Sequence, residues 1–172
     1  MASSKRSTAL ARSWGPISRA RRTIATSSLT RSTSRTRSVV IALGSSLGPR
    51  RLQLRRALRA LSPSVRLVKV SSVHETEPVD APAGSPPFLN MVVAGHTTLA
   101  PEALLEELQR IERTLGRRRT ARNAPRTIDL DLILHGATVM RTPRLTLPHP
   151  RYRQRGFVMN PLRELNLPWA AQ

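Results

Sequence analysis

Apolar and acidic side chains alternate along one short stretch of the chain, from Ile128 to Leu132. Successive side chains of a β-strand point to opposite faces, so Asp129 and Asp131 are predicted to project together from one face. Their apolar neighbours, Leu130 among them, face the other side. Aspartate is depleted in strands, which makes an edge strand with a merely solvated acidic face the less favoured alternative. The pattern predicts a half-buried strand that presents two neighbouring carboxylates.

Two elements are predicted before this strand from their apolar spacing. The apolar run Val39–Leu43 predicts a buried strand, which a turn over Gly44–Gly48 ends. Leucines then recur at helical spacing between Leu54 and Leu61, with arginines on the opposite face. This spacing predicts a helix that stops before Pro63.

The middle of the chain predicts two further strands and a second helix. The strands are expected over Val65–His74 and Phe88–Thr97, and a proline- and glycine-rich surface loop that can cover a site separates them. The helix is expected to begin at Pro101 and to stop at Gly116. The order strand, helix, strand, strand, helix, strand is that of a ferredoxin-like α+β fold, in which helices pack on one face of an antiparallel sheet.

After Gly136 the pattern is less regular. Arg144–Pro150 reads as extended chain, and Arg151–Arg155 as a single helical turn. The apolar run Phe157–Leu162 predicts a last strand.

Charge divides the chain into two parts. The protein has 172 residues and a formal net charge of +19, and its first acidic residue is Glu75. Residues 1–37 hold nine Lys or Arg and 15 Ser or Thr without apolar periodicity, so they are predicted to be a disordered basic extension. Such a composition also fits an organellar transit peptide or an extension without function. Residues 38–172 are predicted to form one domain with the remaining net positive charge, which favours an anionic ligand.

Composition excludes several classes of protein. There is no cysteine, so disulfides and thiol catalysis are excluded, and a zinc site would depend on the four histidines and the carboxylates. No apolar run reaches the roughly 18 residues of a membrane helix. We therefore expect a soluble monomer without a membrane partner, cytoplasmic unless residues 1–37 direct it to an organelle.

The two aspartates and the arginines beside them predict phosphoryl chemistry. Paired carboxylates suit Mg²⁺, a hard cation that takes one or two of them together with phosphates and waters. Arginine guanidinium groups bind phosphate oxygens in pairs. Those close to the aspartates in sequence are Arg117, Arg118, Arg119, Arg122 and Arg126. The combination favours transfer of a phosphoryl group from a nucleotide.

The chain from about residue 39 to 165 resembles the 6-hydroxymethyl-7,8-dihydropterin pyrophosphokinases of folate biosynthesis. The segments that carry the resemblance are Ile41–Gly48, Phe88–Asn90, Gln109–Glu112, Pro125–Asp131, Leu147–His149 and Arg155–Phe157. A glycine-rich turn alone is weak, because it fits neither the P-loop nor the dinucleotide fingerprint. Six matches in the same order are specific. The resemblance implies transfer of pyrophosphate from ATP to the hydroxymethyl group of the dihydropterin.

The resemblance also implies roles for individual residues. Asp129 and Asp131 would bind two Mg²⁺ ions, and Arg117 and Arg126 would stabilise the transferred group. Contacts to ATP are implied for Gln109, Glu112, Arg119, Leu132, Arg144, Thr146, His149 and Arg155. Contacts to the pterin are implied for Thr76, Phe88, Asn90 and Phe157, with the two phenylalanine rings on either side of the flat heterocycle.

Two alternatives stay open at this point. A basic ferredoxin-like module that binds RNA without catalysis would fit the charge, although it would need more aromatic side chains for base stacking. A catalytically degenerate member of the same family would fit Asn123, which stands where the family commonly has tryptophan. No specific nucleic acid is otherwise expected as a partner.

Overall fold

The computed structural model describes residues 35–79, 82–118 and 124–168, all of which belong to one unit, Thr33–Gln172. Nearly all of the expected basic extension, residues 1–34, lies outside the described residues. The strands are β1 (Arg37–Ser45), β2 (Arg66–Val70), β3 (His74–Thr76), β4 (Phe88–Thr97), β5 (Asp129–His135), β6 (Met140–Arg141) and β7 (Thr146–Leu147). The helices are α1 (Arg50–Leu61), α2 (Pro101–Thr114), the short 3-10 turn η1 (Tyr152–Gln154) and α3 (Gly156–Glu164).

The main sheet is antiparallel, with the strand order β2-β4-β1-β5, and β3 pairs with the first residues of β4. Two βαβ units, β1-α1-β2 and β4-α2-β5, interleave so that each crossover passes over one strand of the other unit. This is the ferredoxin-like arrangement, and it confirms the predicted α+β fold.

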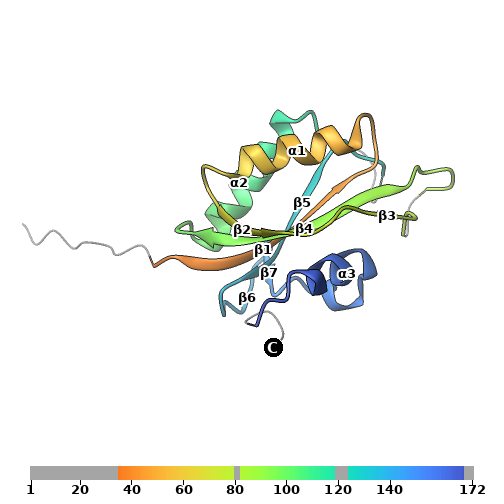
Figure 1. Ribbon diagram of the computed structural model, residues 1–172. Coiled ribbons are helices and arrows are strands. Elements are labelled where there is room, and N and C mark those ends of the chain that lie inside the picture. The colour runs from red at the N-terminus through yellow and green to blue at the C-terminus, as the bar shows by residue number, and fades with distance from the viewer. Residues whose placement is uncertain (1–34, 80–81, 119–123, 169–172) are drawn as a thin grey trace, which may run out of the picture. The chain divides into compact units, whose positions relative to one another are not determined.

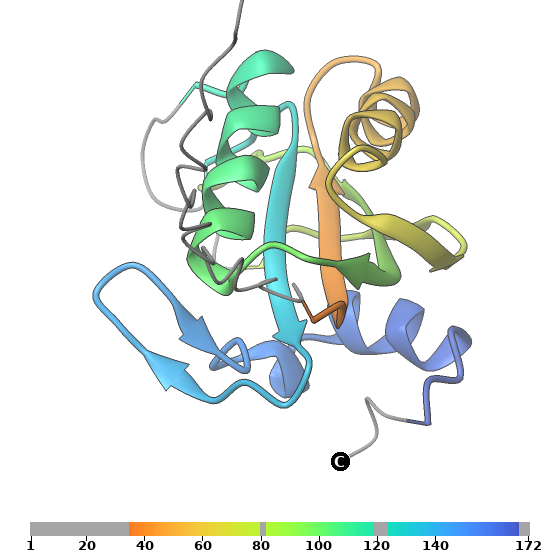
Figure 2. The same cartoon turned by 90° about the vertical axis from the view of Figure 1, so that its left-hand side faces the viewer.

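Helices cover both faces of the sheet, so the prediction of helices on one face alone is wrong. Figure 1 shows α1 and α2 on one side and α3 on the other, and Figure 2 shows α1 and α2 side by side. Under α1 and α2 lies the larger core, in which Leu54 and Leu104 meet Leu130 of β5. Under α3 lies a smaller core that includes Val92 of β4 and Ile133 of β5.

The last element is a helix, so the predicted strand over Phe157–Leu162 is wrong. The N–H groups of Val158 and Met159 both donate to the carbonyl of Arg155 at 2.9 Å, which starts α3. Val158, Leu162 and Leu165 recur at helical spacing and pack against the sheet. Burial of this apolar stripe stabilises the helix. It outweighs both the strand preference of the local residues and the unfavourable effect of Pro161 inside the helix.

The predicted strand Val65–His74 is in fact two strands, β2 and β3, which both pair with β4. Ser71 spans the gap between them. Its N–H donates to the carbonyl of Val92 at 3.0 Å, and its hydroxyl accepts the N–H of Val92 at 2.9 Å. The Val92 N–H thus binds a side-chain hydroxyl in place of a main-chain carbonyl, so the chain can change direction at Ser71.

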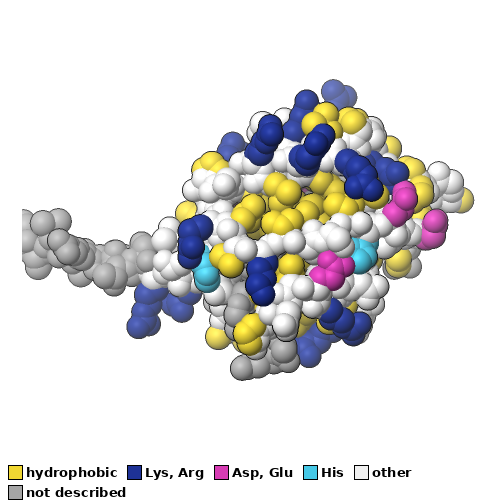
Figure 3. Space-filling view, in the orientation of Figure 1, with side chains coloured by type: hydrophobic (Ala, Val, Ile, Leu, Met, Phe, Trp, Pro, Cys, Tyr) yellow, Lys and Arg dark blue, Asp and Glu magenta, His cyan; other side chains and the backbone are white. Residues whose placement is uncertain are grey.

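The surface agrees with the basic composition. Basic side chains outnumber acidic ones on the face seen in Figure 3. No acidic residue occurs between residues 35 and 73, which include all of α1. None of the helices within the described ranges is long and apolar enough to cross a membrane.

Gly95 of β4 gives a test of the packing between β4 and β2. A Cβ at this position would lie 2.6 Å from the carbonyl oxygen of Arg66 and 2.8 Å from Val65 Cγ1. We expect Gly95→Ala to lower the free energy of unfolding by about 1–3 kcal/mol, the usual cost of overpacking. Gly156→Ala is the control, because a Cβ there meets open space. Equal urea midpoints for the two variants would contradict the expected clash.

Candidate active site

Asp129 and Asp131 lie on the face of β5 opposite α1 and α2. Their partners in the register of β1 are small, Gly44 opposite Asp129 and Ala42 opposite Asp131. A Cβ at Gly44 would lie only 3.1 Å from Oδ1 of Asn90. The alternation in the sequence therefore places both carboxylates beside backbone that leaves room for a ligand.

A cleft of about 370 Å³ opens at these carboxylates, a volume within the range of small-molecule sites. It is formed by β3, β4 and β5 together with the segments before β5 and around η1. Ten of the residues predicted for the site line it: Thr76, Phe88, Asn90, Arg117, Arg126, Asp129, Asp131, His149, Arg155 and Phe157. The structure brings together side chains that span more than eighty positions of the sequence.

Arginines surround the two carboxylates unequally. Arg117 lies 2.5 Å from Oδ1 of Asp129, and Arg126 lies 3.1 Å from Oδ2 of the same carboxylate. Within the described ranges Asp131 has one ion pair, with Arg155 at a longer distance of 3.6 Å. Asp129 is thus held between two guanidinium groups, whereas Asp131 has only partial charge compensation.

Glu112 of α2 holds Arg117 from behind. Its buried carboxylate accepts the N–H of Leu130 at 2.7 Å and forms an ion pair with Arg117. Burial raises the pKa of Glu112, opposed by the Leu130 N–H and by Arg117. Burial also works against the charge of Arg117, but its pairs with Asp129 and Glu112 outweigh this and raise its pKa. Glu112 therefore connects α2 to β5 and to the cleft, without lining the cleft itself.

The turn between β1 and α1 positions Arg126. The carbonyl of Arg126 accepts the N–H groups of Ser46 at 3.0 Å and Leu47 at 3.2 Å, and the Arg126 N–H donates to the Ser46 hydroxyl at 3.0 Å. Ser45 donates its hydroxyl to the carbonyl of Thr127 at 2.6 Å. The predicted turn over Gly44–Gly48 thus fixes the segment that leads into β5.

Both phenylalanines of the cleft lie under an arginine. The guanidinium of Arg126 is 5.7 Å from the ring centre of Phe88, and that of Arg155 is 5.5 Å from the ring centre of Phe157. These distances fit cation–π contacts. Because the same two arginines pair with the two aspartates, the aromatic and the acidic parts of the cleft share their cations.

The amide of Asn90 is oriented within the cleft. Its Nδ2 donates to the hydroxyl of Thr76 at 2.7 Å, and its Oδ1 lies over Gly44. Asn90 is 7% exposed, so this hydrogen bond satisfies a largely buried polar group.

Asp131 carries the clearest electrostatic perturbation. Desolvation raises its pKa to about 7, and the neighbouring charge of Asp129 adds to the shift, while Arg155 opposes it. Desolvation disfavours the charged form of a carboxyl, and the arginines near Asp131 do not supply enough positive charge to offset it. A cation supplied with a ligand would meet that need.

The donors present fit Mg²⁺. No group of three or more His, Asp or Glu side chains suited to a metal ion occurs in the part of the chain that the structure describes. Mg²⁺ does not require one, because it usually binds one or two carboxylates and completes its shell with waters and substrate phosphates. Asp129 and Asp131, which both line the cleft, match that mode of binding.

Comparisons with known proteins agree with this geometry. The family model of 7,8-dihydro-6-hydroxymethylpterin-pyrophosphokinase (HPPK) matches residues 40–167. The 2-amino-4-hydroxy-6-hydroxymethyldihydropteridine pyrophosphokinase of Pseudomonas aeruginosa is 45% identical over 129 residues, which cover 74% of this chain and 79% of that protein. The pyrophosphokinase of the same name from Bacillus subtilis is 46% identical over 127 residues, 73% of this chain and 75% of that protein. The chain belongs to the HPPK family.

Some similar proteins are longer. The mitochondrial folate synthesis bifunctional protein of pea is 41% identical over 128 residues, which cover 74% of this chain but 25% of that protein. A crystal structure of a Plasmodium falciparum HPPK-DHPS mutant with pteroate matches with a TM-score of 0.58 at 14% identity, over 73% of this chain and 39% of that chain. At 14% identity, the match to the Plasmodium falciparum structure shows similarity of fold and nothing more.

Several residues predicted to contact ATP lie away from the HPPK cleft. Leu132 is buried in the core under α1 and α2, and Gln109 is a half-buried residue of α2 outside the cleft lining. Arg144 pairs on the surface with Glu106 at 2.9 Å. Thr146 is in β7, and Arg119 lies outside the described residues. Their contacts to ATP stay predictions.

Other residues line the cleft without having been predicted: Glu77, Val79, Arg151 and Gln154. Arg151 precedes η1 and Gln154 ends it. Both lie between His149 and Arg155, which were predicted, so their place in the sequence was the available signal. Burial lowers the pKa of His149, and the charges of Arg155 and Arg151 add to this shift. This end of the cleft is thus strongly basic.

The raised pKa of Asp131 predicts a dependence of stability on pH in protein free of divalent cations. Since the folded-state pKa of about 7 exceeds the ordinary aspartate pKa of 3.8, the folded state binds the proton more tightly than the unfolded chain does. The stabilisation is complete below the unfolded pKa and is lost as the pH rises through about 7.

We therefore expect Asp131→Asn to gain stability relative to the unsubstituted chain between pH 4 and pH 8, with most of the change below and around pH 7. Urea unfolding of both proteins in a chelator, at several pH values, measures this difference. A difference that does not vary with pH would contradict the raised pKa.

Proposed function

We propose that this protein transfers a pyrophosphoryl group from ATP to 6-hydroxymethyl-7,8-dihydropterin, the reaction named for its HPPK relatives. One observation carries the proposal: the cleft that holds Asp129 and Asp131 among arginines also holds two phenylalanine rings and an oriented amide. The first set suits a polyphosphate, and the second suits a flat heterocycle with a polar edge. Both substrates of the reaction thus find complementary groups in one site.

The reaction forms one bond and breaks one bond at the β-phosphorus of ATP. The hydroxymethyl oxygen of the pterin bonds to this phosphorus and loses its proton. The bond from the β-phosphorus to the oxygen that bridges to the α-phosphate breaks, and AMP leaves with that oxygen. The protein must therefore align two substrates and balance the charge that develops on the phosphoryl oxygens.

Arg117 and Arg126 are proposed to bind the transferred group. Both guanidinium groups already point at a carboxylate of the cleft, and a phosphate presents oxygens in a similar arrangement. Glu112 keeps Arg117 in place through its own ion pair. His149 and Arg155 are proposed to bind the rest of ATP at the basic end of the cleft.

Asp129 and Asp131 would hold two Mg²⁺ ions, which would supply positive charge to offset that of the phosphates. Without a cation the two carboxylates would repel the triphosphate. The residues of the cleft supply the remaining positive charge and the orientation of the substrates.

Phe88 and Phe157 are proposed to take the two faces of the pterin ring, with Asn90 and Thr76 at its polar edge. The RNA-binding alternative is less well supported, because both phenylalanines line the cleft and no open sheet face within the described ranges offers a row of aromatic side chains. The alternative of a catalytically degenerate family member depends on Asn123, which lies outside the described residues. A measurement of turnover distinguishes it from an active enzyme. Monomeric state and a cytoplasmic or organellar location stay predictions.

The first experiment measures AMP release from ATP with and without the dihydropterin alcohol. We expect release that depends on the pterin, and we expect Asp131→Asn to reduce it by about two to three orders of magnitude, because electrostatic stabilisation of the phosphoryl group is the main contribution of such a site. Glu102→Gln, an exposed carboxylate of α2, serves as the control. Near-normal turnover of a folded Asp131→Asn protein would show that Asp131 has no role in the reaction.

A second prediction separates the pterin side from the ATP side. Phe157 and Met159 both pack at the edge of the core under α3, but only Phe157 lines the cleft. Phe157→Ala is expected to weaken pterin binding by about 1–3 kcal/mol through the loss of one stacking face, with a much smaller effect on ATP. Met159→Ala should change stability but not pterin affinity. Calorimetric titration with each ligand measures both, and equal losses for pterin and ATP would identify Phe157 as a core residue only.

A further inference from the structure

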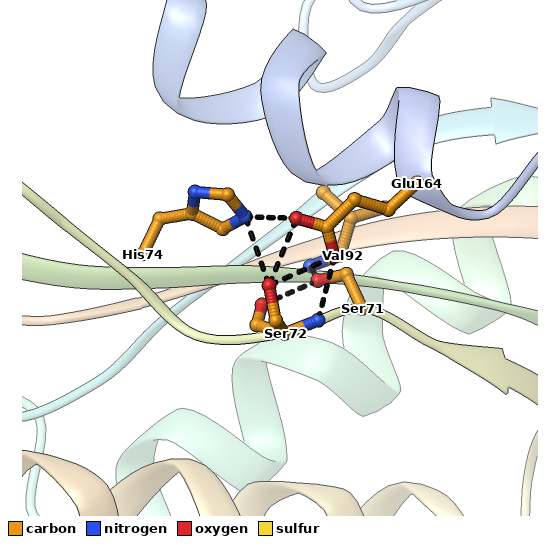
Figure 4. Close-up of polar contacts among 5 residues, drawn as sticks. All are labelled: Ser71, Ser72, His74, Val92 and Glu164. Atoms are coloured by element: carbon orange, nitrogen blue, oxygen red, sulfur yellow. Dashed lines mark hydrogen bonds and ion pairs between the residues drawn. The ribbon is translucent and has the colours of Figure 1, made fainter.

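Three donors from the segment between β2 and β3 converge on one carboxylate of α3. Figure 4 shows Ser72 and His74 on one side and Glu164 on the other. The N–H of Ser72 donates to Oε2 of Glu164 at 2.8 Å, the Ser72 hydroxyl donates to the same carboxylate at 2.8 Å, and Nε2 of His74 donates to Oε1. We call Ser72, His74 and Glu164 the α3 anchor.

The α3 anchor does not have the geometry of a nucleophilic triad. In a triad the two ring nitrogens of histidine serve opposite partners, one the nucleophile and the other the carboxylate. Here Nε2 of His74 lies 3.1 Å from the Ser72 hydroxyl and also contacts Glu164. Both neighbours share one nitrogen, and Ser72 donates directly to the acid. The cluster therefore binds two elements together and does not activate serine.

The place of Glu164 in its helix makes this contact informative. A carboxylate in the last turn of a helix is disfavoured by the negative end of the helix dipole. The hydrogen bonds from the N–H and then the hydroxyl of Ser72 hold the pKa of Glu164 below its usual value, so the carboxylate is charged. Lys69 adds a further donor, since its Nζ lies 2.7 Å from the carbonyl of Leu165 just after the helix. The end of the β2–β3 segment thus compensates an otherwise unfavourable charge.

The two elements joined by the α3 anchor lead directly to the cleft. Glu164 is the last residue of α3, and Phe157 is in its first turn, about 10 Å away along the helix axis at the standard rise per residue. His74 begins β3, and Thr76, which accepts the Asn90 amide, ends it. One side of the anchor therefore carries Phe157, and the other carries Thr76.

Along its length α3 packs on the sheet through an apolar stripe. Val158, Leu162 and Leu165 pack on β4 and β5, and apolar burial is non-directional, so such a face tolerates small shifts and rotations of the helix. The anchor adds directional bonds to Glu164, the helix residue farthest from the cleft. It fixes the direction of the helix that carries Phe157.

We propose that Glu164 is a positioning residue for the pterin side of the cleft, because it locks α3 to β3 and thereby sets the gap between Phe157 and the residues carried by β3 and β4. This inference rests on the proposed function. Glu164 does not line the cleft, so it acts through Phe157 and Thr76.

The test uses the full chain with Glu164→Ala, Glu164→Gln and Ser72→Ala, and with Glu102→Ala as the matched carboxylate control on α2. Steady-state assays give kcat and the KM of each substrate, and calorimetry gives the affinity for the dihydropterin alcohol without turnover. We expect Glu164→Ala to raise the KM for the pterin about three- to tenfold, the range of residues that act through others, with kcat and the KM for ATP nearly unchanged. Glu164→Gln keeps an acceptor for Ser72 and should recover part of the loss.

Several outcomes would overturn the proposal. An equal effect on both substrates, an effect on kcat alone, or pterin kinetics like those of Glu102→Ala would each show that Glu164 does not position the pterin side. If Glu164→Ala fails to fold, Glu164→Gln and Ser72→Ala test the proposal instead. The comparison is again between the change in the KM for the pterin and the change in the KM for ATP. Absence of pterin-dependent AMP release by the unsubstituted chain would refute the proposed function, and calorimetry would then still show whether the anchor changes pterin binding. If the unsubstituted chain also fails to bind the pterin, both the proposed function and the positioning role of Glu164 are overturned.

Discussion

The ion pair between Arg117 and Asp129 is the contact on which the rest of the site depends. It joins the segment after α2 to β5, and Glu112 supports it by binding both Arg117 and the backbone of Leu130. A buried carboxylate left without its partner is costly, so the three charged groups stabilise one another or fail together. The position of α2 over the sheet is thereby coupled to the geometry of the cleft on the other face.

The same cations serve two parts of the cleft. Arg126 contacts both Asp129 and the Phe88 ring, and Arg155 contacts both Asp131 and the Phe157 ring. A guanidinium has five donors in a plane, so it can hold a carboxylate or phosphate at its edge while it stacks on a ring through its face. Any ligand that moves one of these arginines therefore changes the surroundings of an acidic and an aromatic residue together.

The sequence predicted the elements that have one regular pattern and missed those that depend on tertiary contacts. Alternation in β5 placed Asp129 and Asp131 correctly on one face, and helical spacing gave α1 and α2. The strand expected at Phe157–Leu162 failed because a short apolar run reads equally as a strand or a buried helix, and the α3 stripe extends to Leu165. The break at Ser71 was not predictable, since it needs a side-chain bond to Val92, 21 positions away. The resemblance gave ten of the residues that line the cleft. It also counted Leu132 among the contacts to ATP, although the Leu132 side chain faces the core.

Charge balance in the cleft favours the cation that we propose for it. Among the residues that the structure describes, Arg117, Arg126, Arg151 and Arg155 line it, against the three carboxylates of Glu77, Asp129 and Asp131, which leaves one formal positive charge in excess. A triphosphate brings more negative charge than that excess can offset. The raised pKa of Asp131 indicates the same shortage on the protein side, because desolvation and the charge of Asp129 outweigh the charges of Arg155 and Arg126. A divalent cation held by Asp129 and Asp131, as proposed, would offset both deficits at once with two positive charges, whereas a further arginine would bring only one.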